Sequence, residues 1–189
     1  GTVLHNGLNV SGWRTDKLVD RGIAYVPQVD NVFPSLSVRE NLQMGGIKLK
    51  AKKLADGIGR ACKMFPDLEP RMNDLAASLS GGERQMLAIS RALISDPSFL
   101  MLDEPTAGMG REDSTRMVQM LSTLKGSHTV ILVEHDMDAV FALADRITVM
   151  GEGQVITTGP PDVIRTDRAV REAYLGEELH SVTLGAGSG

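Results

Sequence analysis

Cysteine, aromatic residues and long hydrophobic runs are scarce in this chain. Among its 189 residues there is one cysteine, and only 4% are aromatic. The lone Cys62 excludes an intramolecular disulfide, and no neighbouring cluster of His and Cys offers a zinc site of the usual type. This cysteine usage favours a reducing compartment.

Segments that would span or cross a membrane are also missing. No apolar run approaches the roughly 18 residues that a spanning helix needs, and no charged-then-apolar leader opens the sequence. The chain starts with Gly1 rather than Met, so we expect a processed chain or a piece of a longer one. Association with a membrane would then pass through a partner.

The charge balance argues against a nucleic-acid surface. The net charge is -4 and the sequence pI is about 5.6, with KLKAKK at 48–53 as the most basic run. Such a short run is typical of a solvated helix end rather than a DNA contact. A composition of 42% hydrophobic and 23% charged residues predicts an ordinary globular domain with a sizeable core.

Turn and cap residues mark the elements of the first half. Asn6-Gly7 predicts a hairpin between two short strands. GIAYVPQ predicts a strand that Pro27 ends, and the spacing of Ser37 and Glu40 predicts a capping box with a helix beginning at Ser37. From 49 to about 77 the pattern is helical, and we expect breaks at Gly57, Gly59, Pro66 and Pro70.

The second half alternates apolar strands with helices. SFLMLDE and TVILVEH predict buried strands, followed by helices over 111–125 and 137–144. A hairpin at 152–153 and one or two terminal helices follow. This alternation predicts a parallel sheet covered on both faces, with Trp13 and Tyr25 packed under it.

A glycine-led helix and the ends of the two strands carry the candidate chemistry. Gly81 and Gly82 precede ERQMLAISRALI, and exposed backbone N–H groups at a helix start bind phosphate. Asp103, Glu104 and His135 stand at the carboxyl ends of the strands, where ligands gather in such sheets.

Each of these residues also has a purely structural interpretation. Two adjacent acids at a strand end can hold Mg²⁺ and polarise a water, or they can face solvent and cap the next helix. A lone His at a strand end is more often an ordinary edge residue, as we expect for His5, His128 and His180. Gln28 by itself is a loop amide, and SGG by itself is a turn.

The ordered combination of motifs is more specific. LSGGERQ is followed by FLMLDEP, with 23 residues from Ser80 to Asp103, and then by VEHD, 31 residues from Glu104 to His135, while VPQ lies upstream. This set resembles the nucleotide-binding domain of ATP-binding-cassette (ABC) proteins over nearly the whole chain. The resemblance implies an α/β fold with a P-loop NTPase-like (RecA-like) core, a parallel sheet, a helical subdomain and a C-terminal hairpin with helices.

The resemblance also implies a role for each matching residue. Asp103 matches the acid linked to Mg²⁺ in the Walker B strand, and Glu104 matches the general base. Gln28 matches the loop glutamine near Mg²⁺ and the attacking water, and His135 matches the switch histidine that contacts the γ-phosphate. The signature loop, which we define as Ser80, Gly81, Gly82 and Glu83, would close over ATP held by a second subunit.

The implied division of the chain has four parts. Residues 1–36 would form a partial N-terminal core, and 37–95 a helical subdomain with the signature loop. Residues 96–175 would carry the Walker B strand, the dimer-contact loop and the switch histidine, and 176–189 would be a flexible tail.

Finer features narrow the resemblance. VFPSLSVREN, LSGGERQMLAISRAL, VEHDM and REAYLG look like the branched-chain amino acid (Leu/Ile/Val) uptake ATPases. This likeness implies an importer with two ATPase subunits, as a homo- or heterodimer, together with membrane permease subunits and a substrate-binding protein. It places the ATPase in the cytoplasm, peripheral at the inner face of the plasma membrane.

Two departures from the family pattern matter. No G-x-x-x-x-G-K-[ST] motif occurs in the sequence, and that loop supplies the phosphate cradle, the lysine and the hydroxyl on Mg²⁺. We therefore expect an N-terminally truncated fragment that is inactive and poorly stable alone. Directly after the dimer-contact loop, which we define as Pro105 to Gly110, Arg111 stands where the family has Pro.

Two alternative functions stay open at this level. The chain could be a degenerate half that contributes only its signature loop to a partner's ATP site, although Asp103, Glu104 and His135 would then have no chemical use. A soluble ABC ATPase of DNA repair or translation would need a long coiled-coil insert or tandem cassettes. Ser80 lies only 52 positions after Gln28, which leaves room for a small helical subdomain.

Overall fold

The computed structural model describes residues 1–29 and 31–175. Two compact units make up the chain, Gly1–Ala139 and Val140–Gly189. The expected tail over 176–189 lies outside the described residues, and the four-part division of the chain stays a prediction. Within the described residues, no helix combines the length and apolar character that crossing a membrane requires.

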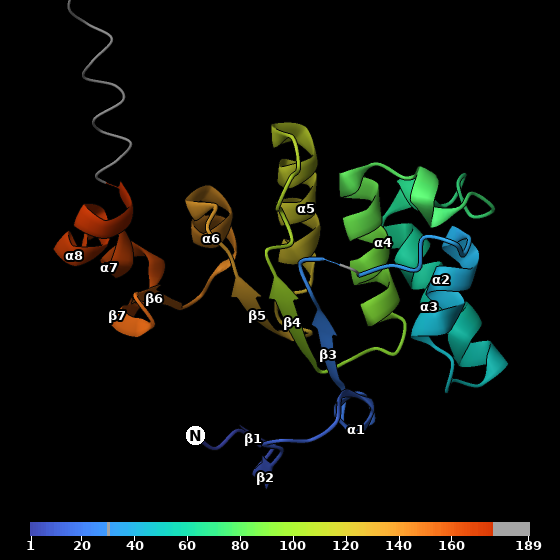
Figure 1. Ribbon diagram of the computed structural model, residues 1–189, viewed down its shortest axis with the longest axis horizontal. Helices are drawn as coiled ribbons and strands as arrows, with labels where there is room; N and C mark the ends of the chain where they lie inside the picture. The colour runs from blue at the N-terminus through green and yellow to red at the C-terminus, as the bar shows by residue number, and fades with distance from the viewer. Residues whose placement is uncertain (30, 176–189) are drawn as a thin grey trace, which may run out of the picture. The chain divides into compact units, whose positions relative to one another are not determined.

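A parallel sheet lies at the centre of the first unit (Figure 1). It contains β3 (Ile23–Val26), β4 (Phe99–Asp103) and β5 (Thr129–Val133) in that order. Tyr25 pairs with Met101 and Met101 with Ile131, so the strands run in register. The α/β class and the parallel sheet are confirmed.

The two faces of this sheet differ in burial, which contradicts the expectation that both are covered. Leu100 and Leu102 are at most 1% exposed, whereas Tyr25 and Ile131 on the opposite face keep 47% and 49%. When each successive strand joins a parallel sheet at the same edge, the right-handed crossovers between the strands all lie on the same face of the sheet. Because the order β3-β4-β5 never reverses, both connections cover one face, and the described elements leave the other largely open.

The connection from β3 to β4 is mostly helical. It holds α2 (Val38–Gly45), α3 (Ala51–Met64), the 3₁₀ turns η1 (Pro66–Leu68) and η2 (Ala76–Ser78), and α4 (Gly81–Leu93). The capping box of Ser37 and Glu40 is confirmed by both of its hydrogen bonds. This local geometry begins α2 at the predicted place.

The expected breaks at Gly57 and Gly59 do not occur, because α3 continues to Met64 before Pro66. A Cβ on Gly57 would lie 2.8 Å from the carbonyl oxygen of Ile94. The glycine at position 57 therefore allows α3 to approach the end of α4 closely, and it does not break the helix. Leu42, Leu68 and Leu87 are fully buried in the core of this segment.

The first unit also contains the N-terminal hairpin and one further long helix. β1 (Leu4–His5) and β2 (Leu8–Asn9) pair around Asn6 and Gly7, whose φ angles are 50° and 77°. This left-handed pair is typical of the predicted two-residue turn. The short α1 (Thr15–Val19) precedes β3, and α5 (Arg111–Thr123) connects β4 to β5.

The second unit is a hairpin packed with short helices. β6 (Ile147–Gly151) and β7 (Gln154–Gly159) pair antiparallel around the predicted turn, and α7 (Pro161–Thr166), α8 (Arg168–Val170) and the π-helical turn η3 (Arg171–Leu175) follow. Its core contains Ile147, Val149, Ile164 and Val170. The helix α6 (Met137–Leu143) spans the boundary between the two units.

Candidate functional site

The end of β4 places an acid in an unusual backbone conformation. Asp103 is the last residue of the strand, and Glu104 follows it with a φ of 45°. A left-handed conformation is uncommon for a residue with a side chain, and outside turns such strained residues cluster at active sites. The Glu104 amide still donates to the carbonyl oxygen of Val133 at 2.9 Å, so the strained residue stays attached to β5.

Three of the predicted residues meet at the Glu104 carboxylate. Gln28 Nε2 donates to Glu104 Oε2 at 2.6 Å, and His135 Nδ1 lies 3.6 Å from the same oxygen. The side chain of Glu104 is 30% exposed and that of His135 is 70% exposed. A carboxylate flanked by an amide and an imidazole, and open to solvent, can hold and polarise a water molecule.

Asp103 has a partner that the sequence interpretation missed. The Tyr25 hydroxyl donates to Asp103 Oδ2 at 3.2 Å. Desolvation and the nearby Asp103 charge raise the pKa of Tyr25, which keeps the phenol protonated as a donor. The expectation that Tyr25 packs under the sheet is wrong. Its register with Met101 puts it on the same strand face as Asp103, two residues further along β4.

A buried acid, Glu134, connects the loops that follow β4 and β5. One of its carboxylate oxygens accepts from the Thr106 amide at 3.0 Å and from the Thr106 hydroxyl. The other oxygen accepts from the amides of His135 at 2.8 Å and Asp136 at 3.1 Å. Its side chain is 0% exposed. Glu134 therefore holds the segment after Glu104 beside the segment that carries His135.

The signature loop forms the start of α4. Ser80 is the N-cap, its Oγ accepts from the Glu83 amide at 3.2 Å, and Glu83 Oε2 accepts from the Ser80 amide at 2.7 Å. A Cβ built on Gly81 would meet nothing within 4 Å. The helix start is thus rigidly capped while its first glycine faces open space, which suits a phosphate approaching from outside.

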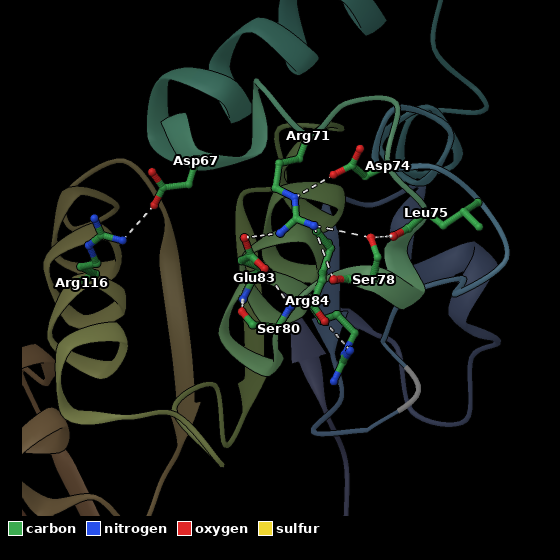
Figure 2. A network of polar contacts seen from close by, with 10 residues as sticks. Asp67, Arg71, Asp74, Leu75, Ser78, Ser80, Glu83, Arg84 and Arg116 are labelled. Carbon is green, nitrogen blue, oxygen red and sulfur yellow. Dashed lines mark hydrogen bonds and ion pairs between the residues drawn. The ribbon is translucent and has the colours of Figure 1, made fainter.

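The signature loop and the Glu104 cluster are separate within this chain. In the part of the chain that the structure describes, no hydrogen bond or ion pair joins residues 80–83 to Glu104 or His135. Figure 2 shows instead that Glu83 of the loop contacts Arg71 and that Arg116 of α5 pairs with Asp67. The two halves of the candidate site therefore do not meet through direct polar contacts.

A hollow of about 480 Å³ lies between the loop after Glu104 and the loop after β5. Thr106, Arg111, Ser114 and His135 are among its lining residues. Arg111, the departure from the family pattern, is the first residue of α5. The departure therefore concerns the wall of this hollow and leaves the contacts of Glu104 unchanged.

The acids fit the usual binding of Mg²⁺ beside nucleotides, in which one or two carboxylates act with phosphate oxygens and water. Among the described residues, no group of three or more His, Cys, Asp or Glu side chains could hold a metal by itself. Asp103 supplies a single carboxylate at the strand end, next to Glu104. This donor set fits a metal whose remaining ligands come from a nucleotide.

Comparison with known families points in the same direction. Residues 1–107 match the family described as "ABC transporter", and residues 154–180 match the family described as "Branched-chain amino acid ATP-binding cassette transporter". The first match covers more than half of the chain and includes Gln28, the signature loop, Asp103 and Glu104.

Three curated relatives align over most of the chain. The high-affinity branched-chain amino acid transport ATP-binding protein BraG of Pseudomonas aeruginosa is 34% identical over 177 residues, which cover 93% of this chain and 76% of BraG. The probable branched-chain amino acid transport ATP-binding protein LivF of Archaeoglobus fulgidus is 36% identical, covering 84% and 68%. The lipopolysaccharide export system ATP-binding protein LptB of Haemophilus influenzae is 28% identical, covering 95% and 76%.

Solved structures share the fold. MJ1267, an ATP-binding cassette of an ABC transporter, superposes with a TM-score of 0.80 at 24% identity, covering 92% of this chain and 76% of that one. A dimeric post-hydrolysis state of the ATP-binding cassette MJ0796, bound to ADP and Pi, superposes with a TM-score of 0.74 at 26% identity, covering 85% and 73%.

Proposed function

The chain belongs to the ABC transporter family of ATP-binding proteins, and from this premise we propose that it serves a branched-chain amino acid importer as its ATP-hydrolysing subunit. The named relatives BraG and LivF support this substrate class, as does the match of residues 154–180. LptB proteins, which are named for lipopolysaccharide export, are also similar, at 28% identity in Haemophilus influenzae and 32% in Escherichia coli, against 34% for BraG and 36% for LivF.

The observation that carries the proposed chemistry is the cluster around Glu104. Gln28 and His135 both approach Glu104 Oε2, at 2.6 Å and 3.6 Å. In the proposed reaction Glu104 orients the attacking water as the general base, and His135 contacts the γ-phosphate. Asp103, with Gln28 nearby, serves the Mg²⁺ that accompanies ATP and offsets the phosphate charge.

A second subunit completes the proposed site. The signature loop, Ser80–Glu83, lies apart from Glu104 and presents Gly81 to open space. We propose that it closes over ATP bound to the partner, and that the partner's loop closes over ATP beside this Glu104. Membrane permease subunits, served by a binding protein, would hold the pair at the cytoplasmic face of the membrane.

The 189 residues carry no phosphate-cradling G-x-x-x-x-G-K-[ST] motif. Removing one preorganised donor costs about 10² to 10³ in rate, so a polypeptide of these residues alone should show no turnover. The open sheet face with Tyr25, Met101 and Ile131 supports the further proposal that such a polypeptide is poorly stable alone. Cooperative thermal unfolding of the purified 189-residue monomer would contradict the proposal that it is poorly stable alone.

The same missing motif favours one alternative, a non-catalytic half that offers only its signature loop to a partner. The discriminating experiment compares Glu104→Gln with Ser80→Ala in the assembled complex, with ATP hydrolysis followed by phosphate release. Loss of a general base lowers the rate by about 10² to 10⁴, so our proposal expects Glu104→Gln to abolish most turnover while ATP still binds.

The matched control is Glu69→Gln, which changes an exposed acid at the end of η1 and should keep the parent rate. A complex that tolerates Glu104→Gln but loses activity with Ser80→Ala would support the non-catalytic alternative. Uptake of labelled leucine, isoleucine and valine by cells with and without the Glu104→Gln variant then tests the substrate class.

A further inference from the structure

A single arginine, Arg71, contacts both the signature loop and the residues that precede it. Arg71 follows η1, and its Nη1 lies 2.7 Å from Glu83 Oε1 while its Nε lies 2.9 Å from Asp74 Oδ2. Its Nη2 approaches the carbonyl oxygen and the hydroxyl of Ser78 at 3.4 and 3.5 Å. Figure 2 shows the guanidinium between the residues that precede the loop and the first turn of α4.

The contact to Glu83 reaches the loop itself. Glu83 uses one carboxylate oxygen for Arg71 and the other for the Ser80 amide at 2.7 Å. The carboxylate therefore bridges Arg71 to the backbone of Ser80. Because Ser80 is also the N-cap of α4, a shift of Glu83 moves the residue that begins the loop.

The charges of this bridge persist at neutral pH. Burial raises the pKa of Glu83, but hydrogen bonds from Ser80 and Arg71 outweigh it and hold the pKa below its ordinary value. The hydrogen bonds to Asp74 and Glu83 raise the pKa of Arg71. The side chains of Arg71 and Glu83 are only 28% and 24% exposed, so solvent screens this pair less than a surface pair.

The backbone around Arg71 is itself anchored to the start of α2. The Arg39 amide donates to the carbonyl oxygen of Met72, and the Val38 amide donates to that of Asp74, both at 3.0 Å. The Ala76 amide donates to the carbonyl oxygen of Leu36 at 2.9 Å. The guanidinium therefore projects from a fixed segment, which is what a positioning residue requires.

We propose that Arg71 is a positioning residue for the signature loop and that, through this loop, it sets the rate of ATP hydrolysis in the partner's site. It touches neither nucleotide nor Glu104 and acts through Glu83 and Ser80. The inference rests on the proposed function, because it assumes that the loop serves the other subunit. The forked guanidinium of an arginine can donate to Asp74, Glu83 and the Ser78 carbonyl oxygen through separate N–H groups, whereas a lysine has only a single ammonium group for all three.

The test uses dimers in the assembled complex whose two protomers carry different tags. One protomer carries Glu104→Gln, which leaves a single working site, formed by the partner's Glu104 and the signature loop of the substituted protomer. In the first arrangement Arg71→Gln is placed on the protomer with Glu104→Gln. In the second arrangement Arg71→Gln is placed on the other protomer, whose loop faces the disabled site.

Both arrangements contain the same substitutions, so a loss of fold stability affects them alike. We expect phosphate release in the first arrangement to be about tenfold slower than in the second, within the range found when a supporting residue is removed. Arg71→Lys, which keeps the positive charge, should give a smaller loss in the first arrangement only. Arg116→Gln, which breaks the exposed pair with Asp67, should give equal rates in both.

Equal rates of the two Arg71→Gln arrangements would overturn the inference and leave the proposed function standing. If Arg71→Gln chains do not assemble, the same two arrangements are compared with Arg71→Lys instead. Equal rates of the two Arg71→Lys arrangements would then overturn the inference. An unmodified complex of the natural subunits, as distinct from the 189-residue polypeptide alone, that hydrolyses no ATP would refute the proposed function, and the inference with it.

Discussion

Replacement of Glu134 should be among the most destabilising changes outside the apolar core. Its side chain is 0% exposed, and its carboxylate accepts from three backbone amides and the Thr106 hydroxyl. Glutamine has one acceptor oxygen instead of two, so Glu134→Gln must turn an NH₂ group toward one pair of donors. The Thr106 side is the less costly choice, because a hydroxyl can rotate and accept.

The magnitude follows from the donors left without a partner. In Glu134→Gln the Thr106 amide loses its acceptor, and a buried unsatisfied donor costs about 1–3 kcal/mol. Glu134→Leu leaves the amides of Thr106, His135 and Asp136 without this acceptor; water can reach the exposed His135 amide, and the part-buried Thr106 and Asp136 amides give about 2–6 kcal/mol by the same value per donor. Since a whole domain is stable by about 5–15 kcal/mol, the leucine variant loses a substantial part of its stability.

Urea unfolding followed by circular dichroism measures these differences on the subunit as it occurs naturally, and not on the isolated 189-residue polypeptide, which we propose to be poorly stable. The expected order of destabilisation is Glu134→Leu, then Glu134→Gln, then the exposed control Glu69→Gln, which should stay within about 0.5 kcal/mol of the parent. An unchanged slope against urea shows that the free energy, rather than the compactness of either state, has changed. A Glu134→Leu protein as stable as the control would refute the proposal that the hydrogen bonds of Glu134 hold the two loops together.

Two further predictions concern the helical segment. Asn41 is fully buried and accepts from the Phe33 amide at 2.8 Å, so Asn41→Ala should cost about 1–3 kcal/mol of unfolding free energy, and an unchanged urea midpoint would contradict this. Hydrogen bonds from Ser37 lower the pKa of Glu40, and the pKa of Glu83 is also lowered. The stability they contribute is therefore full above the ordinary glutamate pKa of about 4.3 and is lost as pH falls through the lower folded values. The gap in unfolding free energy between the parent and a Glu40→Gln, Glu83→Gln double variant should close on acidification, and a gap independent of pH would show that neither charge matters.

Several features follow from local rules and could be predicted residue by residue. The hairpin at Asn6-Gly7 and the helix start at Ser37 depend on residues at most three positions apart. The placement of Glu104 and His135 at one edge follows because both come after apolar strands, and parallel strands end on the same edge. The family resemblance added the assignment of roles, and the comparisons confirm the family.

Other features depend on how distant segments pack. The strand pattern predicted helices on both faces of the sheet, but the order β3-β4-β5 puts the crossovers on one face. Glycine in α3 suggested a helix break, whereas Gly57 fits against the carbonyl of Ile94. Neither strand order nor a close approach between helices is encoded in the spacing of nearby residues.

The sequence by itself determined the parallel α/β class, the capped helices and the acids at the strand ends, because these depend on neighbours along the chain. Only the tertiary structure decided that Tyr25 bonds Asp103, that Glu134 joins two loops and that Arg71 supports the signature loop. The physical reason is that a hydrogen bond requires its atoms to lie within about 3 Å. Tyr25 and Asp103 are 78 positions apart, and only the register of β3 against β4 brings them within that distance.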